Sequence, residues 1–138
     1  MTEITGGCLC GAVRFRCSAE PLGARVCWCR DCQRFGAGGP TVNVMFPREA
    51  VAIEGPLGEF ASLADSGNPM RRRFCPTCGV HLFSETDARP QVIVVRAGAL
   101  DDPEAANPQM TIWTASAPSW AFFHEDLPQA ERQAPPIA

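Results

Sequence analysis

The sequence has no lysine and no tyrosine, and its two histidines are His81 and His124. All twelve basic residues are arginine, which excludes a Schiff-base mechanism through a lysine amine. The missing tyrosine excludes a phenolic acid or nucleophile, and two histidines leave few ways to build a histidine-centred catalytic relay. Any chemistry must therefore depend on cysteines, carboxylates or a bound metal.

Long hydrophobic runs are also missing. No run approaches the roughly 20 apolar residues that a membrane-spanning helix needs, and the first residues lack the basic and apolar regions of a secretion signal. We therefore expect a cytoplasmic protein without a membrane anchor. The net charge of −3 and the pI near 5.3 argue against a protein whose main task is to bind nucleic-acid phosphates.

What the sequence does contain is eight cysteines, which allow either a disulfide framework or metal binding. Seven of them lie in C-x-C or C-x-x-C spacings, which are typical of chelating loops. Thiols one residue apart could close only a strained disulfide. The missing secretion signal points the same way, so we expect metal-bound thiolates.

The hydrophobic pattern predicts a single, mainly β domain over residues 1–138, with a core at about 4–128 and an irregular C-terminal tail. Glycine and proline turns separate many short runs rich in β-branched and aromatic residues. We expect strands at residues 13–17, 41–46, 51–55, 58–63, 80–84, 91–97 and 111–114, and one helical turn at 101–106. In the first strand, Val13, Phe15 and Cys17 alternate with two arginines, so Cys17 should be a small buried residue.

Four cysteines form the complete ligand set of a closed metal site. Cys10 and Cys78 are each followed by glycine, which can adopt positive φ and turn backbone N–H groups toward the thiolates, whereas Cys32 is followed by glutamine. We therefore assign Cys8, Cys10, Cys75 and Cys78 to one structural zinc, whose binding would stabilise the fold. In the alternative, Cys75 and Cys78 join the remaining three cysteines instead.

The remaining cysteines, Cys27, Cys29 and Cys32, offer three thiolates to an ion that prefers four ligands. Three thiolates leave a zinc centre with a net charge near −1, which weakens its power to acidify water and favours exchange of thiolates instead. We therefore predict a second, catalytic zinc with an open position for a substrate that brings its own sulfur. The alternative is a purely structural site that Asp31, His81 or a buried water closes.

Several other side chains have both a chemical and a structural interpretation. Arg71 and Arg73, on one face of a strand, could bind an anionic substrate, although ion pairs or solvation suit residues 71–73 better. Asp31 could carry protons, but we expect it to cap the cysteine loop, and we expect His81 to be a hydrogen-bonded core residue. Four aromatic residues near the C-terminus could line a pocket, or more simply hold the tail in place: Trp113, Trp120, Phe122 and Phe123.

Five motifs, in order along nearly the whole chain, resemble the glutathione-dependent formaldehyde-activating enzyme family, the GFA/centromere protein V group. The motifs are GCLCGAVRF at residues 7–15, CWCRDC at 27–32, RFCPTCG at 73–79, GALDDP at 98–103, and Trp120 followed by DLP at 126–128. The resemblance implies a β-tent fold of short antiparallel strands in two stacked, zinc-binding sheets. It also implies a structural zinc on Cys8, Cys10, Cys75 and Cys78, and a catalytic zinc on Cys27, Cys29 and Cys32.

The activity that the resemblance implies is that of a carbon–sulfur lyase, in which glutathione and formaldehyde are joined as, or released from, S-(hydroxymethyl)glutathione. The expected partner is therefore a small thiol such as glutathione, and neither nucleic acid nor a membrane. Two alternatives stay open. One is a non-catalytic interaction module with two structural zincs, a use that the related centromere protein and a Rab exchange-factor chaperone suggest; the other is a nucleic-acid-binding zinc ribbon, which the acidic charge disfavours.

Overall fold

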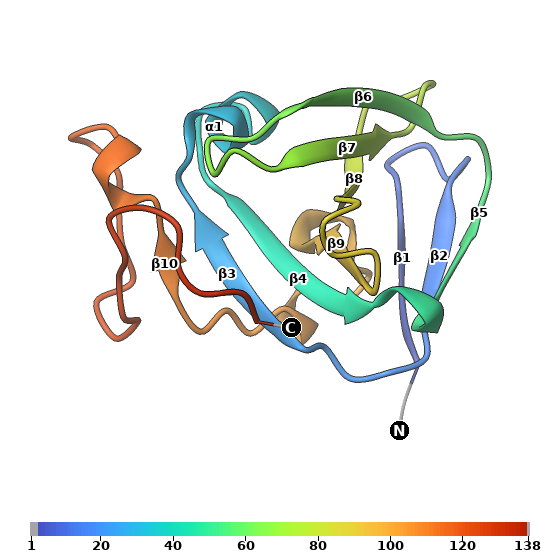
Figure 1. The fold of residues 1–138 in the computed structure, drawn as a ribbon. Helices are drawn as coiled ribbons and strands as arrows, with labels where there is room; N and C mark the ends of the chain where they lie inside the picture. Colours follow the sequence, from blue (N-terminus) through green and yellow to red (C-terminus); the bar gives the residue numbers. More distant parts are fainter. Residues whose placement is uncertain (1–2, 138) are drawn as a thin grey trace.

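Two β-sheets form the body of the protein, as a computed structural model describes it for residues 3–137 (Figure 1). The smaller sheet has the strand order β1–β2–β5, and the larger one has the order β10–β3–β4–β9–β8–β7–β6. Paired strands are antiparallel in both sheets, except that β10 runs parallel to β3. The prediction of a mainly β, single-domain protein with two sheets is confirmed.

The elements are short. The smaller sheet contains β1 (Ile4–Gly7), β2 (Arg14–Cys17) and β5 (Val51–Glu54). The larger sheet contains β10 (Thr111–Ile112), β3 (Gly23–Cys27), β4 (Thr41–Pro47), β9 (Val92–Arg96), β8 (His81–Glu85), β7 (Pro69–Phe74) and β6 (Gly58–Leu63). The one α-helix of residues 3–137 is α1 (Arg30–Phe35), so no helix in this part of the chain is long enough to cross a bilayer.

Every strand expected from the sequence is present in the structure. In β2, Phe15 and Cys17 are buried and the two arginines are exposed, as the alternation predicts. The expected helical turn is a 3₁₀ turn at Pro103–Ala105, where the Asp102 carboxylate accepts a hydrogen bond from the backbone N–H of Glu104. Here a proline at the first helical position and an aspartate cap identify the turn correctly.

Three of the ten strands in residues 3–137 are not among the expected ranges: β7, whose arginines are expected on a strand without stated bounds, and two strands that are not predicted at all. The glycine density of residues 5–11 predicts a loop, but Ile4–Gly7 form β1. Gly6 is tolerated in this strand for a packing reason: a Cβ there would clash with the Phe15 ring and with the backbone oxygen of Ala99. Glycine is required there by close packing within a strand rather than by a turn. The second missed strand is β3, whose pattern of small and charged residues has no clear alternation.

The core is built from residues of both sheets. Phe15 from β2 and Phe83 from β8 meet edge to face with ring centroids 5.2 Å apart, a favourable aromatic geometry. Val44, Phe46 and Val95 from the larger sheet belong to the same buried cluster. Burial of these side chains fixes how the two sheets face each other, and it places the ends of β1 and β7 where the cysteines lie.

The chain after β10, residues 117–137, contains no strand but packs closely against the larger sheet (Figure 1). Gln129 forms an isolated parallel bridge with Thr111, and Ala134 is buried beside the cysteines at the end of β3. The side chain of Arg25 donates a hydrogen bond to the backbone oxygen of Pro135 (2.6 Å). We call this stretch the C-terminal segment.

Phe15→Ala tests the contact between the sheets. Because Phe15 is 1% exposed, its truncation should lower the free energy of unfolding by about 3–5 kcal/mol, as measured by urea denaturation of the zinc-loaded protein. Phe122→Ala is the matched control, because Phe122 is 92% exposed and its loss should change stability by less than about 0.5 kcal/mol. Equal effects of the two substitutions would contradict this description of the core.

Candidate metal centres

Seven of the eight cysteines gather in two clusters, and the ligand atoms within each cluster lie within 4.8 Å of one another. We call them the Cys8 cluster (Cys8, Cys10, Cys75 and Cys78) and the Cys27 cluster (Cys27, Cys29 and Cys32). All eight cysteines are free thiols. The eighth, Cys17, is fully buried in the core, and burial raises the pKa of its thiol to about 11, so it is the small apolar residue that the sequence predicts.

The Cys8 cluster joins the two sheets. Cys8 and Cys10 follow β1 of the smaller sheet, whereas Cys75 and Cys78 follow β7 of the larger sheet. The sulfur of Cys10 lies 3.6 Å from that of Cys8 and 3.7 Å from that of Cys75. A single ion bound by four such sulfurs would cross-link segments more than 60 residues apart, so its binding would stabilise the fold directly.

The turns of the Cys8 cluster have the backbone geometry expected of metal knuckles. Gly11 has φ +83° and Gly79 has φ +78°, a left-handed conformation that glycine adopts at little cost. The backbone N–H of Val13 donates to the sulfur of Cys8 (3.3 Å). Such N–H groups stabilise a thiolate and leave it free to bind a metal.

The Cys27 cluster forms where β3 ends and α1 begins. Cys27 is the last residue of β3, Cys29 is the N-cap of α1, and Cys32 lies in the first helical turn. The backbone N–H of Cys32 donates to the sulfur of Cys29 (3.2 Å). The prediction of a loop here is wrong. A cysteine fills the capping position usually held by serine, threonine, aspartate or asparagine, and the six-residue helix is too short to show a hydrophobic period.

Ionisation of the Cys27 cluster shows why it suits a cation. Hydrogen bonds from Cys27 and Cys29 lower the pKa of Cys32, whereas hydrogen bonds with Cys29 and Cys32 raise the pKa of Cys27. One thiolate is therefore readily formed, and the next ones are opposed by its negative charge. A divalent ion removes this repulsion, and three sulfurs at one point are a donor set that zinc accepts.

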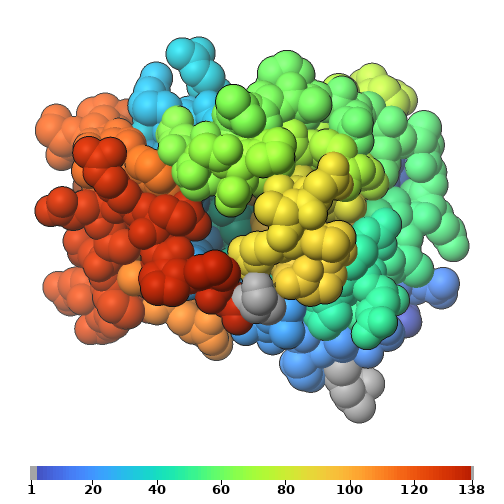
Figure 2. Space-filling view, viewed as in Figure 1, coloured from blue at the N-terminus to red at the C-terminus, as the bar shows by residue number. Residues whose placement is uncertain are grey.

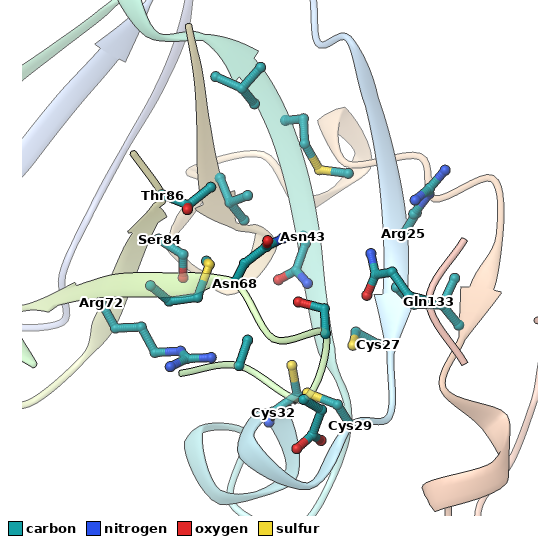
Figure 3. A pocket seen from close by; sticks show the side chains of 18 of the residues that line it. Arg25, Cys27, Cys29, Cys32, Asn43, Asn68, Arg72, Ser84, Thr86 and Gln133 are labelled. Atoms are coloured by element: carbon teal, nitrogen blue, oxygen red, sulfur yellow. Dashed lines mark hydrogen bonds between the residues drawn. The ribbon is translucent and has the colours of Figure 1, made fainter. Parts of the chain in front are cut away.

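The Cys27 cluster lines an open pocket (Figure 3). Figure 2 shows the opening as a hollow between the C-terminal segment in red, the β6–β7 turn in light green and the β8–β9 connection in yellow. Met45, Val94 and Ile112 contribute apolar surface, and Arg72 and Arg96 contribute positive charge. The sulfurs are therefore reachable by a small molecule that enters from this face.

No fourth ligand from residues 3–137 completes the Cys27 cluster, because no other histidine, cysteine or carboxylate atom joins its three sulfurs within 4.8 Å. The carboxylate of Asp31 pairs with Arg72 instead (3.5 Å). His81 accepts a hydrogen bond at Nδ1 from Arg96 (3.3 Å) and packs on the ring of Phe35. The expected cap function of Asp31 is also wrong, since Cys29 caps the helix.

His81 is hydrogen-bonded, as expected, but it is half-buried at the start of β8 rather than part of the core. Burial, together with the positive charges of Arg96 and Arg72, lowers the pKa of its imidazole to about 3, so the ring is neutral near pH 7. Its hydrogen bond with Arg96 joins β8 to β9 beside the pocket. The structure gives it a role in packing and hydrogen bonding.

The three consecutive arginines of β7 point alternately to opposite faces. Arg71 pairs with Asp87 (3.0 Å), and Arg73 pairs with Glu59 (3.2 Å) and Glu85 (3.3 Å). Both therefore have the ion-paired role that we expect. Arg72 is 4% exposed and lines the pocket, so the arginine that faces the candidate site is the one between the two considered for anion binding.

The four aromatic residues near the C-terminus have different roles: two pack against Trp28, one lines the pocket and one is exposed. Trp28, which lies between Cys27 and Cys29, meets Trp120 and Phe123 edge to face at 6.4 and 6.2 Å. These two residues hold the C-terminal segment in place, as expected. Trp113 lines the pocket, whereas Phe122 is exposed and does neither.

The polar network beside the Cys27 cluster is not predicted from the sequence. Arg96 donates hydrogen bonds to the side chains of Thr41 (3.3 Å), Ser84 (2.8 Å) and Asn43. The sequence does contain a signal for this network: Arg96 ends the apolar run of β9, and a charged side chain at the end of a buried strand needs polar partners. The four residues come from strands β4, β8 and β9, and strand pairing could not be read from the sequence.

Comparisons with known proteins point to one family. Residues 3–116 match the family model described as glutathione-dependent formaldehyde-activating enzyme. A protein of Halomonas elongata whose name contains the same words is 27% identical over 125 residues, which cover 85% of this chain and 78% of that protein. The crystal structure of a Rhodobacter sphaeroides protein resembles this structure with a TM-score of 0.58 and 23% sequence identity, and the match covers 75% of this chain and 94% of that chain. At this identity the likeness supports the fold alone.

Cys78→Ala tests the structural assignment of the Cys8 cluster. Loss of one of four ligands should release the ion that joins the sheets and cost more than about 4 kcal/mol of stability, seen as loss of soluble, folded protein by circular dichroism. Cys17→Ala removes the same atom from the core without touching either cluster, and it should leave the protein folded. A well-folded Cys78→Ala variant would contradict the assignment.

Proposed function

The chain belongs to the glutathione-dependent formaldehyde-activating enzyme family, and on this premise we propose that it is a zinc-dependent enzyme acting on an adduct of a thiol and an aldehyde, such as S-(hydroxymethyl)glutathione. The observation that carries the proposal is the Cys27 cluster: three thiols meet at the wall of an open pocket, without a fourth ligand from residues 3–137. The donor set fits zinc, and the pocket offers room for a further sulfur.

In this proposal Cys27, Cys29 and Cys32 hold the catalytic zinc, and the Cys8 cluster holds the structural one. Bound zinc supplies a position that can hold a thiolate and stabilise it as a leaving group. The three protein sulfurs bring three negative charges, which favours binding of a further sulfur over generation of hydroxide. The three cysteines therefore select the class of ligand as well as the metal.

The reaction is a reversible carbon–sulfur cleavage. In the lyase direction the carbon–sulfur bond breaks, the sulfur keeps the electron pair, and the hydroxyl proton leaves as the aldehyde forms. The pocket favours this charge distribution, because the guanidinium of Arg72 lies at its wall and attracts a developing thiolate. Met45, Val94 and Ile112 exclude water from part of the pocket and so strengthen that attraction.

The same pocket carries groups suited to a thiol with carboxylates. Arg25 and Arg89 both line it, and within residues 3–137 the Nε and Nη2 atoms of Arg89 are buried without a hydrogen-bond partner. Burial lowers the pKa of Arg25, and the positive charge of Arg89 adds to this effect. Two neighbouring arginines favour an anion between them, and the arginine fork matches a carboxylate. We assign them to the carboxylates of the thiol.

The alternative of a non-catalytic module with two structural zincs would need a fourth ligand from the chain at the Cys27 cluster. The two side chains considered for this role, Asp31 and His81, are engaged with Arg72 and Arg96 instead. The sulfurs also face a pocket rather than a closed core. These observations favour an enzyme over a module.

Cys29→Ser separates metal binding from helix capping. Serine caps helices well, so α1 should remain, but the second zinc should be lost and the zinc content should fall from two per chain to one. Calorimetric titration with glutathione should then show no binding, while circular dichroism stays unchanged. Unfolding of Cys29→Ser would mark the Cys27 cluster as structural and contradict the proposal.

Arg89→Gln tests recognition of the thiol's carboxylates. Loss of a charged hydrogen bond worth about 1.5–3 kcal/mol should raise KM for the glutathione adduct by about tenfold or more and change kcat little. The adduct of glutathione dimethyl ester, which has no carboxylate, should react equally well with both proteins. An equal rise in KM for the two substrates would show that Arg89 acts on the shape of the pocket rather than on the carboxylates.

A further inference from the structure

Arg96 is a charged residue in a buried position. It is 8% exposed and ends β9 beside the Cys27 cluster. Its guanidinium donates to His81 Nδ1, Thr41 Oγ1, Asn43 Oδ1 and Ser84 Oγ. All four acceptors are neutral groups, so these hydrogen bonds fix the orientation of the guanidinium without balancing its charge.

No carboxylate of residues 3–137 lies within 4.0 Å of a nitrogen of Arg96. Arg72, the other buried arginine of the pocket, differs in having Asp31 at 3.5 Å. A buried charge without an opposite charge is strongly destabilising, and buried arginines are normally paired. The charge of Arg96 therefore requires a negative partner other than a carboxylate of the described chain.

Arg96 lines the same pocket as the three sulfurs of the Cys27 cluster, and the two carboxylates of that pocket, Asp65 and Glu85, form no ion pair with it. Thr41, which accepts a hydrogen bond from Arg96, lies opposite Cys27 in the pairing of β3 with β4. Figure 3 shows Asn43 and Ser84, two of the acceptors of Arg96, in the same pocket as the three cysteines. A buried cation and three clustered thiols thus line one pocket.

We propose that Arg96 is a positioning residue that supplies the buried counter-charge of the three-thiolate metal centre, an inference that rests on the zinc site of the proposed function. A divalent ion with three thiolates carries one net negative charge, and one guanidinium neutralises it. The folded protein therefore favours the metal-loaded cluster with all three thiols deprotonated. A neutral centre also accepts an anionic thiolate more readily than a negative one.

Asn43→Asp tests this inference with a nearly isosteric change. The side-chain oxygen of residue 43 already accepts from Arg96, so a carboxylate there would neutralise the guanidinium and leave the fold intact. Zinc affinity at the Cys27 cluster, measured by competition with a chelator, should fall about 10- to 100-fold. The Cys8 cluster serves as internal control, and its affinity should not change.

Asn107→Asp is the matched control for charge, because Asn107 is exposed, lies outside the pocket and has positive φ, which aspartate also tolerates. It should leave both affinities unchanged. Arg96→Lys keeps the charge and should retain most of the zinc affinity at the Cys27 cluster, whereas Arg96→Gln should lose it. Equal losses in these two variants would show that Arg96 acts only through its hydrogen bonds and would overturn the inference.

The outcomes also separate this inference from the proposed function. Wild-type protein that binds one zinc, at the Cys8 cluster alone, would defeat the proposed function itself. Wild-type protein that binds two zincs, together with an Asn43→Asp variant of equal affinity at the Cys27 cluster, would overturn the role of Arg96 alone. Failure of Asn43→Asp to fold even without zinc at the Cys27 cluster would also count against it, because the guanidinium already donates to residue 43 and, without the metal centre, should pair with a carboxylate there.

Discussion

The repulsion between closely packed thiolates, and its relief by a bound cation, is the constraint on which the structure depends. Seven sulfurs lie in two groups so tight that they cannot all ionise without a positive charge between them. Zinc in the Cys8 cluster would turn this constraint into a cross-link between the sheets. In the Cys27 cluster the same constraint yields a centre that opens onto a pocket, which is where a substrate sulfur could add a fourth ligand.

Much of the site could be predicted because cysteine spacing is a local signal. The glycines after Cys10 and Cys78 identify the knuckles, and both adopt the positive φ that the prediction requires. The helix that carries Cys32 could not be predicted, since its cap is an unusual one. Arg96 could not be placed either, because its partners come from two other strands, β4 and β8, and the pairing of these strands with β9 depends on the whole sheet.

The two clusters differ in their position in the fold, and the proposed division into a structural and a catalytic site rests on this difference. The Cys8 cluster lies where turns from two sheets meet, so its ion would contribute to folding. The Cys27 cluster lies between β3, α1 and the C-terminal segment, in a pocket that Arg25, Arg72, Arg89 and Arg96 also line. In the proposed function, positive charge around the sulfurs would favour anionic thiols, which agrees with the glutathione dependence in the family's name.

Cadmium-113 NMR of the cadmium-loaded protein tests the central claim most directly, because it resolves the two metal centres and reports the number of sulfur ligands at each. We predict one resonance typical of four sulfurs, which glutathione leaves unchanged, and a second typical of three sulfurs, which moves toward the four-sulfur range when glutathione is added. Two four-sulfur resonances in the absence of glutathione, or a second resonance that glutathione does not move, would contradict the account.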